Sequence, residues 1–109
     1  MADSFEKLFP KQLRAFMVEF DVPPLTDEIV ELIPKQRLTV GKMMSAGTLL
    51  TYTLSADRRK LWSVMLGSSI KGIEEELQKF PITRFMQHRI SELMFHEAAT
   101  AGIPSMSMN

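Results

Sequence analysis

The stretch "LLTYTLSADRRKLWSVMLG", residues 49–67, decides the fold because it has the pattern of a β-hairpin. On each arm, one set of large apolar side chains alternates with a second, more mixed set, as in a strand with two different faces. Between the arms, the polar segment from Ala56 to Arg59 predicts the turn. The large apolar set is predicted to lie on the face of the sheet that the helices cover. From the hairpin it contains Leu50, Tyr52, Leu54, Trp62, Val64 and Leu66, and from the segment before it Phe16, Val18 and Phe20.

A strand and a helix are expected before the hairpin. The segment "RAFMVEFDV", residues 14–22, alternates in the same way and predicts a strand. Thr26 then fits a helix N-cap, and Gly47 fits the residue just after the end of that helix. Pro34 lies inside the helical pattern, so a kink or a break is expected there.

A second helix and a last strand are expected after the hairpin. Ser68 or Ser69 can cap this helix, and Pro81 is expected to end it. Residues 79–97 then predict a strand. The order βαββαβ is typical of ferredoxin-like α+β folds, with two helices on one face of a four-stranded antiparallel sheet. The expected division is an N-terminal extension at 1–13, the α+β domain at 14–97 and a C-terminal tail at 98–109.

Composition narrows the classes of partner. The chain of 109 residues has 13 basic and 13 acidic side chains, so no basic field predicts binding to nucleic acid or to an anionic membrane. There are no cysteines, and no apolar run approaches the roughly 18 residues of a membrane span. We therefore expect a cytoplasmic protein. No phosphate loop or metal-ligand spacing is present, and no feature calls for a cofactor or a metal.

The second face of the predicted sheet is the clue to function. It is too apolar for a solvated face and too polar for a dry core, which predicts a cavity closed by a partner subunit. The alternative is a half-wet sheet face with scattered apolar residues. The residues assigned to this face are Met17, Glu19, Leu49, Thr51, Thr53, Leu61, Ser63 and Met65.

Several short segments resemble the muconolactone delta-isomerase family of dimeric α+β barrel proteins. They are "AFMVEFDVP" at 15–23, "AGTLL" at 46–50, "LWSVM" at 61–65 and "FP" at 80–81, followed by the spacing of Met86, Ile90, Leu93 and His96. The resemblance implies a homodimer packed sheet to sheet around a cavity, able to assemble into larger closed oligomers. It also implies a cofactor-free reaction of aromatic catabolism, in which a double bond moves within an unsaturated lactone acid.

Two segments depart from the family's pattern, and no catalytic residue is carried over. Residues 32–45 contain no carboxylate, although the family's first helix carries acidic and basic residues facing the cavity. Asp57, Arg58 and Arg59 stand where the family is expected to have a glycine–histidine pair. These three residues are predicted to form a solvated turn, or alternatively a charged cluster at the mouth of the barrel.

Glu19 is the candidate proton-transfer residue, because a carboxylate beside apolar groups has a raised pKa and can act as a base. The alternative is a Glu19 paired with an arginine, either Arg37 or Arg89. Those arginines could equally bind a substrate carboxylate. The residues predicted to bind substrate are Met17, Arg37, Thr51, Thr53, Ser63, Met65 and Arg89.

The two histidines are predicted to pack rather than to react. His88 and His96 would lie roughly 26 Å apart in an unbroken strand, at about 3.3 Å per residue, and so could not share a metal ion within one subunit. The leading hypothesis is a protein that binds a small unsaturated lactone or acid between subunits and shifts its double bond. The alternative is a non-catalytic ligand-binding or assembly module on the same fold, and whether the chain is an enzyme stays open.

Overall fold

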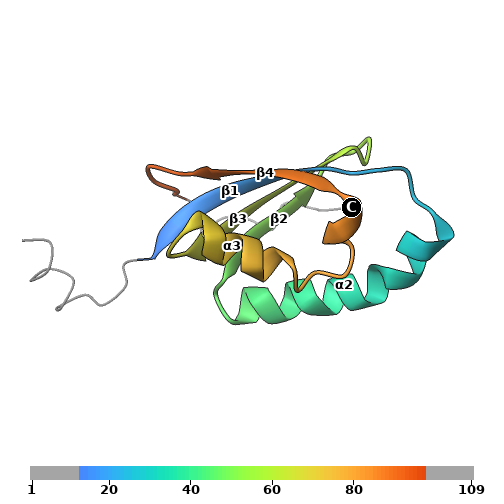
Figure 1. Cartoon of the computed structure of the whole chain (residues 1–109), viewed down its shortest axis with the longest axis horizontal. Coiled ribbons are helices and arrows are strands. Elements are labelled where there is room, and N and C mark those ends of the chain that lie inside the picture. The colour runs from blue at the N-terminus through green and yellow to red at the C-terminus, as the bar shows by residue number, and fades with distance from the viewer. Residues whose placement is uncertain (1–12, 98–109) are drawn as a thin grey trace, which may run out of the picture.

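The computed structural model describes residues 13–97, so nearly all of the predicted N-terminal extension and the whole predicted C-terminal tail lie outside the described residues (Figure 1). The described elements confirm the order βαββαβ. They form a four-stranded sheet in the order β2-β3-β1-β4, with every neighbouring pair antiparallel. The elements are β1 (Arg14–Asp21), α2 (Asp27–Ser45), β2 (Leu49–Leu54), β3 (Lys60–Gly67), α3 (Ile70–Leu77), the 3₁₀ turn η1 (Thr83–Phe85) and β4 (Gln87–Glu92).

Helix α2 begins and ends where the sequence predicts. The Thr26 hydroxyl accepts a hydrogen bond from the backbone N–H of Ile29 at 3.2 Å. At the other end, Gly47 has φ +80°, and its N–H donates to the carbonyl of Met44 while Thr48 N–H donates to that of Met43. This is the Schellman arrangement, which favours glycine because a Cβ is strained in the left-handed region.

The helix continues through Pro34 as one element, so the predicted interruption does not occur as a break. Proline removes one backbone donor at this position. The helix packs residues on both sides of Pro34 against the sheet, with Ile29, Gln36 and Met43 buried. Since tertiary packing supplies most of the stability of helices in proteins, burial on both sides offsets the single lost hydrogen bond.

Helix α3 is shorter than its pattern suggested. Ser69 caps it, accepting from the backbone N–H of Gly72 at 3.0 Å, as predicted for one of the two serines. It ends at Leu77, ahead of Pro81, and a 3₁₀ turn then leads into β4. The predicted strand over residues 79–97 is therefore too long, because only Gln87–Glu92 pair with β1.

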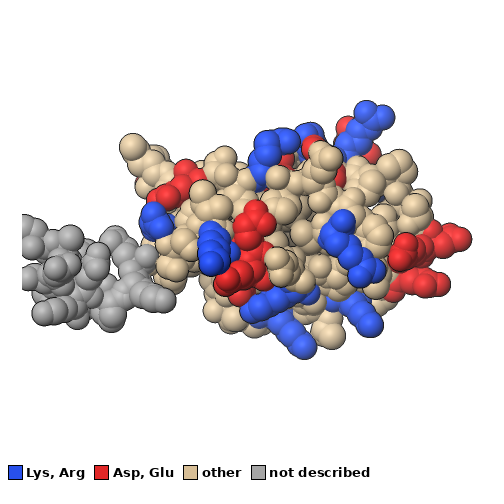
Figure 2. Space-filling model, in the orientation of Figure 1, with Lys and Arg blue, Asp and Glu red and all other residues tan. Residues whose placement is uncertain are grey.

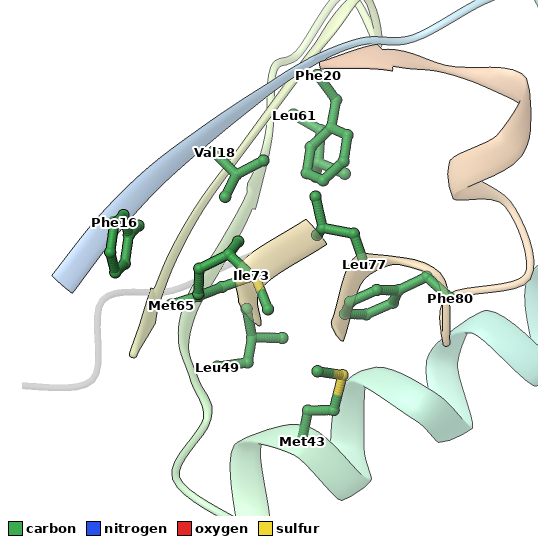
Figure 3. Close-up of a cluster of buried hydrophobic side chains, with 10 residues drawn as sticks. All are labelled: Phe16, Val18, Phe20, Met43, Leu49, Leu61, Met65, Ile73, Leu77 and Phe80. Atoms are coloured by element: carbon green, nitrogen blue, oxygen red, sulfur yellow. The ribbon is translucent and has the colours of Figure 1, made fainter. Parts of the chain in front are cut away.

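Figure 1 shows both helices against the same face of the sheet, as the predicted fold class requires. Between them and the sheet lies one apolar cluster, drawn in Figure 3. It consists of Phe16, Val18, Phe20, Met43, Leu49, Leu61, Met65, Ile73, Leu77 and Phe80. Among the described helices, none is both long and apolar enough to cross a bilayer.

The prediction for β3 was wrong by one residue. In the sheet register, Phe16 pairs with Met65 and Phe20 with Leu61, and paired residues share a face. The odd-numbered residues of β3 therefore lie under the helices. Trp62, Val64 and Leu66 instead lie on the face that the described helices leave uncovered, which we call the open face. A shift of one residue exchanges the two faces of a strand, so every assignment on β3 is reversed.

The prediction for β2 was partly right. Tyr52 and Leu54 pair with Ser63 and Leu61 of the helix-covered face, while Thr51 and Thr53 lie on the open face. Leu49 is only 2% exposed and belongs to the core, contrary to the prediction. The reason is a register shift between Leu49 and Thr51, which changes the alternation of side chains at the start of the strand.

Candidate functional site

Glu19 lies on the open face, in an ion-pair network that spans three strands. Its Oε2 accepts from Lys60 Nζ of β3 at 2.9 Å and from Arg89 Nη2 of β4 at 2.5 Å. Lys60 Nζ also donates to Asp21 Oδ1 at 2.5 Å, and Arg89 Nη1 lies 3.6 Å from Asp21 Oδ2. We call Glu19, Asp21, Lys60 and Arg89 the charge cluster. Neighbouring strands bring these residues together, since Glu19 pairs directly with Arg89 and Asp21 with Lys60.

The charge cluster makes Glu19 a weaker base. The hydrogen bond from Lys60 is the largest cause that lowers the pKa of Glu19, and the positive charges of Arg89 and Lys60 lower it further. Partial burial acts in the opposite direction but is outweighed. The hydrogen bond from Lys60 is also the largest cause that lowers the pKa of Asp21. The hydrogen bonds to Asp21 and Glu19 raise the pKa of Lys60. The structure thus shows the arginine pairing that the sequence left as the alternative for Glu19.

The other predicted site residues divide between the two faces of the sheet. Met17, Thr51 and Thr53 share the open face with Glu19. Ser63 and Met65 do not, since they are 2% and 0% exposed beneath the helices. Their placement on the same face as Glu19 was wrong, because the alternation in β3 was assigned in the opposite sense.

The structure gives Thr51 a hydrogen bond, and Arg37 a position, that the sequence did not indicate. The Thr51 hydroxyl accepts from the backbone N–H of Val64 at 2.9 Å, next to the register shift, so it supports the pairing of β2 with β3. Arg37 lies on α2, on the opposite side of the sheet from Glu19, and lines a pocket there. Within residues 13–97, Arg37 makes no ion pair with Glu19, although one hollow is lined by both Arg37 and two members of the charge cluster, Asp21 and Lys60.

That pocket lies between α2 and the sheet, and we call it the inner pocket. It has a volume of about 450 Å³, and its lining is largely apolar. Its residues come from the β1–α2 connection, from α2, from β2 and β3, and from the segment around η1. They are Val22, Pro23, Leu25, Ile29, Ile33, Gln36, Arg37, Val40, Tyr52, Leu54, Leu61, Ile82 and Met86.

Two polar side chains in the inner pocket are joined to each other. Gln36, only 6% exposed, donates from Nε2 to the Tyr52 hydroxyl at 3.0 Å. Gln36 Oε1 accepts from the backbone N–H of Ile82 at 3.1 Å. Since the Tyr52 oxygen accepts in the first bond, its own proton is available to a ligand. Burial raises the pKa of Tyr52, so the phenol stays protonated at neutral pH.

A wider hollow, the outer groove, continues from the inner pocket. It has a volume of about 1020 Å³ and shares part of its lining with the pocket, including Ile33, Arg37 and Leu54. The remainder comes from the end of β1 and from the hairpin turn. Residues lining only the outer groove are Asp21, Pro24, Asp57, Arg58, Arg59 and Lys60.

His88 packs, as predicted. Its Nε2 lies 2.8 Å from Glu74 Oε1 of α3, and its ring stacks at a tilt on Phe20 with centroids 5.9 Å apart. His96 lies beyond the end of β4. Within residues 13–97, no three histidine or carboxylate side chains gather in a way that could hold a metal ion.

Charge on the described surface is mixed. Figure 2 shows acidic and basic side chains distributed together over the visible face.

Comparison with protein-family models finds no match, and neither does comparison with curated proteins. Membership of the muconolactone delta-isomerase family therefore stays a prediction from the quoted segments, and of its features only the ferredoxin-like fold is compatible with the structure.

Proposed function

We propose that this protein binds a small unsaturated acid or lactone in the inner pocket. The observation that carries the proposal is the pocket itself, a largely apolar hollow of about 450 Å³ lined by Gln36 and Tyr52, whose side chains are hydrogen-bonded to each other. Ligand sites in proteins are typically hollows of about 300–1,000 Å³ in which a few polar groups orient an apolar body. The apolar lining suits the hydrocarbon part of such a ligand, and the Tyr52 proton suits its carbonyl oxygen.

The proposed place differs from the one expected from sequence. A cavity between subunits would use the open face, whereas the inner pocket lies within one subunit, under α2. The proposal keeps the expected ligand class and the resemblance to the isomerase family, and it changes the binding residues. Of the residues predicted from sequence to bind substrate or transfer a proton, only Arg37 lines the pocket.

Binding is better supported than isomerisation. A cofactor-free shift of a double bond needs a group that removes a proton from carbon and returns it elsewhere. The residues lining the inner pocket include neither a carboxylate nor a histidine, and Glu19 lies on the other face of the sheet with a lowered pKa. Proton transfer by Glu19 stays a prediction, and it would require a substrate bound at the open face.

Subunit assembly is a second candidate function, favoured by a separate observation. The open face carries a strip of apolar side chains on neighbouring strands, with Val64 buried and Met17, Trp62 and Leu66 half-buried. The described helices do not cover this strip. We propose that it packs against a second copy of the chain, burying more than roughly 1,200 Å² in total. Such a homodimer is compatible with ligand binding in the inner pocket.

A binding experiment with a pocket-filling variant tests the main proposal. Titration of ¹⁵N-labelled protein with cinnamate and with the lactone coumarin should shift the Gln36 side-chain amide signals. Leu54→Trp should abolish these shifts, because Leu54 lines the pocket and is 52% exposed, so that a larger ring can enter the hollow without disrupting the core.

Val30→Trp is the matched control, since Val30 is on α2, 47% exposed and outside the pocket lining. It should leave the titration unchanged. Shifts confined to Met17, Trp62 and Thr53 would place the ligand on the open face and contradict the proposal.

A further inference from the structure

The lining of the outer groove is rich in charge, in contrast to the inner pocket. Four basic side chains line it, namely Arg37, Arg58, Arg59 and Lys60. Two acidic side chains, Asp21 and Asp57, lie among them. An anion could bind in the groove only at basic side chains that do not already form an ion pair with an acidic neighbour.

Each acid is held by neighbours other than Arg37 and Arg58. Asp21 is paired with Lys60 at 2.5 Å within the charge cluster, and this takes up the Lys60 ammonium. Asp57 Oδ1 accepts from the Ser55 hydroxyl at 2.7 Å and from the backbone N–H of Arg59 at 3.0 Å. These two hydrogen bonds, that from Ser55 first, are the main causes that lower the pKa of Asp57, and the positive charge of Arg59 lowers it further. Within residues 13–97, neither acid makes an ion pair with Arg37 or Arg58.

Among the described residues, none of the three arginines of the groove makes an ion pair, and Arg59 is the one whose charge acts on Asp57, which leaves Arg37 and Arg58. Both are exposed, and within residues 13–97 neither guanidinium group makes an ion pair or a side-chain hydrogen bond. They approach the groove from different elements, Arg37 from α2 and Arg58 from the turn between β2 and β3. Guanidinium groups present paired N–H donors that match carboxylate and phosphate oxygens.

The hairpin turn holds Arg58 in an unusual backbone conformation. Its φ of 63° lies in the left-handed region, where glycine and asparagine are favoured. Its N–H donates to the carbonyl of Ser55 at 2.9 Å, and the Ser55 hydroxyl accepts from the N–H groups of Arg59 and Lys60. The conformation of the turn therefore does not explain why residue 58 is an arginine. A role for its side chain in the lining of the outer groove does explain it.

We propose that the outer groove recognises the anionic head of an amphipathic acid, with Arg37 and Arg58 binding the head while its apolar body occupies the inner pocket. This inference rests on the proposed function and changes its ligand from an acid or a neutral lactone to an amphipathic molecule with an anionic head. The ligand is a hydrocarbon chain or ring that carries a carboxylate or a phosphate. Asp57, Arg58 and Arg59 then form a charged cluster at the mouth of a ligand site, as in the alternative interpretation of the turn, although this site lies within one subunit.

Three probes that share one chain test the proposal: octanoate, octyl phosphate and 1-octanol. Each is titrated into ¹⁵N-labelled protein, and the Gln36 side-chain amide reports occupation of the inner pocket. We expect at least one of the two anions to bind about 10-fold more tightly than octanol, the size of a charge-assisted hydrogen bond. Whichever anion binds more tightly identifies the head as carboxylate or phosphate.

Arg37→Gln and Arg58→Gln should each weaken anion binding several-fold and leave octanol binding unchanged. Arg84→Gln is the matched control, because Arg84 is exposed and lines neither hollow. Equal affinity for all three probes would overturn the head-group assignment and leave the pocket proposal standing. An unshifted Gln36 amide with every probe would overturn both. An equal loss in Arg84→Gln would show a general charge effect and refute the specific role of Arg58.

Discussion

Replacing Gln36 by methionine should destabilise the fold, because this side chain links α2 to two other segments through hydrogen bonds. Gln36 is 6% exposed, and it joins α2 to Tyr52 of β2 at 3.0 Å and to Ile82, before η1, at 3.1 Å. Methionine preserves most of the volume and removes both bonds. Each such hydrogen bond contributes about 1 kcal/mol, so the free energy of unfolding should fall by about 2 kcal/mol.

Urea denaturation followed by circular dichroism measures this loss. Tyr52→Phe alone should cost about 1 kcal/mol, since it removes one of the two bonds. In the double variant Gln36→Met/Tyr52→Phe, the Tyr52 bond is lost only once, so the costs should fall short of additivity by about 1 kcal/mol. Gln78→Met is the control, because Gln78 is exposed beyond α3 and should change stability by less than about 0.5 kcal/mol.

Two results would refute the reasoning. One is a loss below about 0.5 kcal/mol for Gln36→Met, the range of ordinary surface substitutions. The other is strict additivity in the double variant, which would show that Gln36 and Tyr52 do not interact. Either result would remove the polar anchor of the inner pocket.

Variants at Thr26, Arg58 and Lys60 test the α2 cap, the hairpin turn and the charge cluster in turn. Thr26→Ala should cost about 1 kcal/mol in urea denaturation by removing the α2 cap, and wild-type stability would contradict the assigned cap. Arg58→Gly should leave stability unchanged or raise it by up to about 1 kcal/mol by relieving the left-handed conformation, while anion binding falls; a clear loss of stability would count against a ligand-binding role. Because pairing lowers the pKa values of Glu19 and Asp21, their stabilisation is present above the ordinary values of 4.5 and 3.8 and is lost as pH falls through the lowered ones. Lys60→Met should therefore flatten the loss of stability between pH 7 and pH 3, and an unchanged acid profile would show that the charge cluster does not stabilise the fold.

The fold could be predicted because its local features agree with one another. Thr26, Gly47 and Ser69 mark helix ends through hydrogen bonds made within a few residues, and these are readable from sequence. The alternation in β1 was also readable, because Phe16, Val18 and Phe20 contrast with Glu19 and Asp21. In β3 both sets of residues are largely apolar, so the face was decided only by pairing with β1, a long-range contact.

The candidate site was less accessible to sequence reasoning. Glu19 and Arg89 were recognised as possible partners, and the sheet register brings them together. The inner pocket was missed because its lining comes from five separate segments, and apolar residues in each have the pattern of ordinary core. Gln36 was the available indication, since a buried glutamine needs partners and marks a polar contact inside an apolar region.

The location of a bound ligand tests the central claim most directly. Intermolecular nuclear Overhauser effects, measured on the protein saturated with octanoate or cinnamate, report which side chains touch the ligand. Binding in the inner pocket predicts contacts from the ligand to the Met86 methyl, the Val40 methyls and the Tyr52 ring. Contacts to the Met17 methyl and the Trp62 indole instead would place the ligand on the open face and contradict the account.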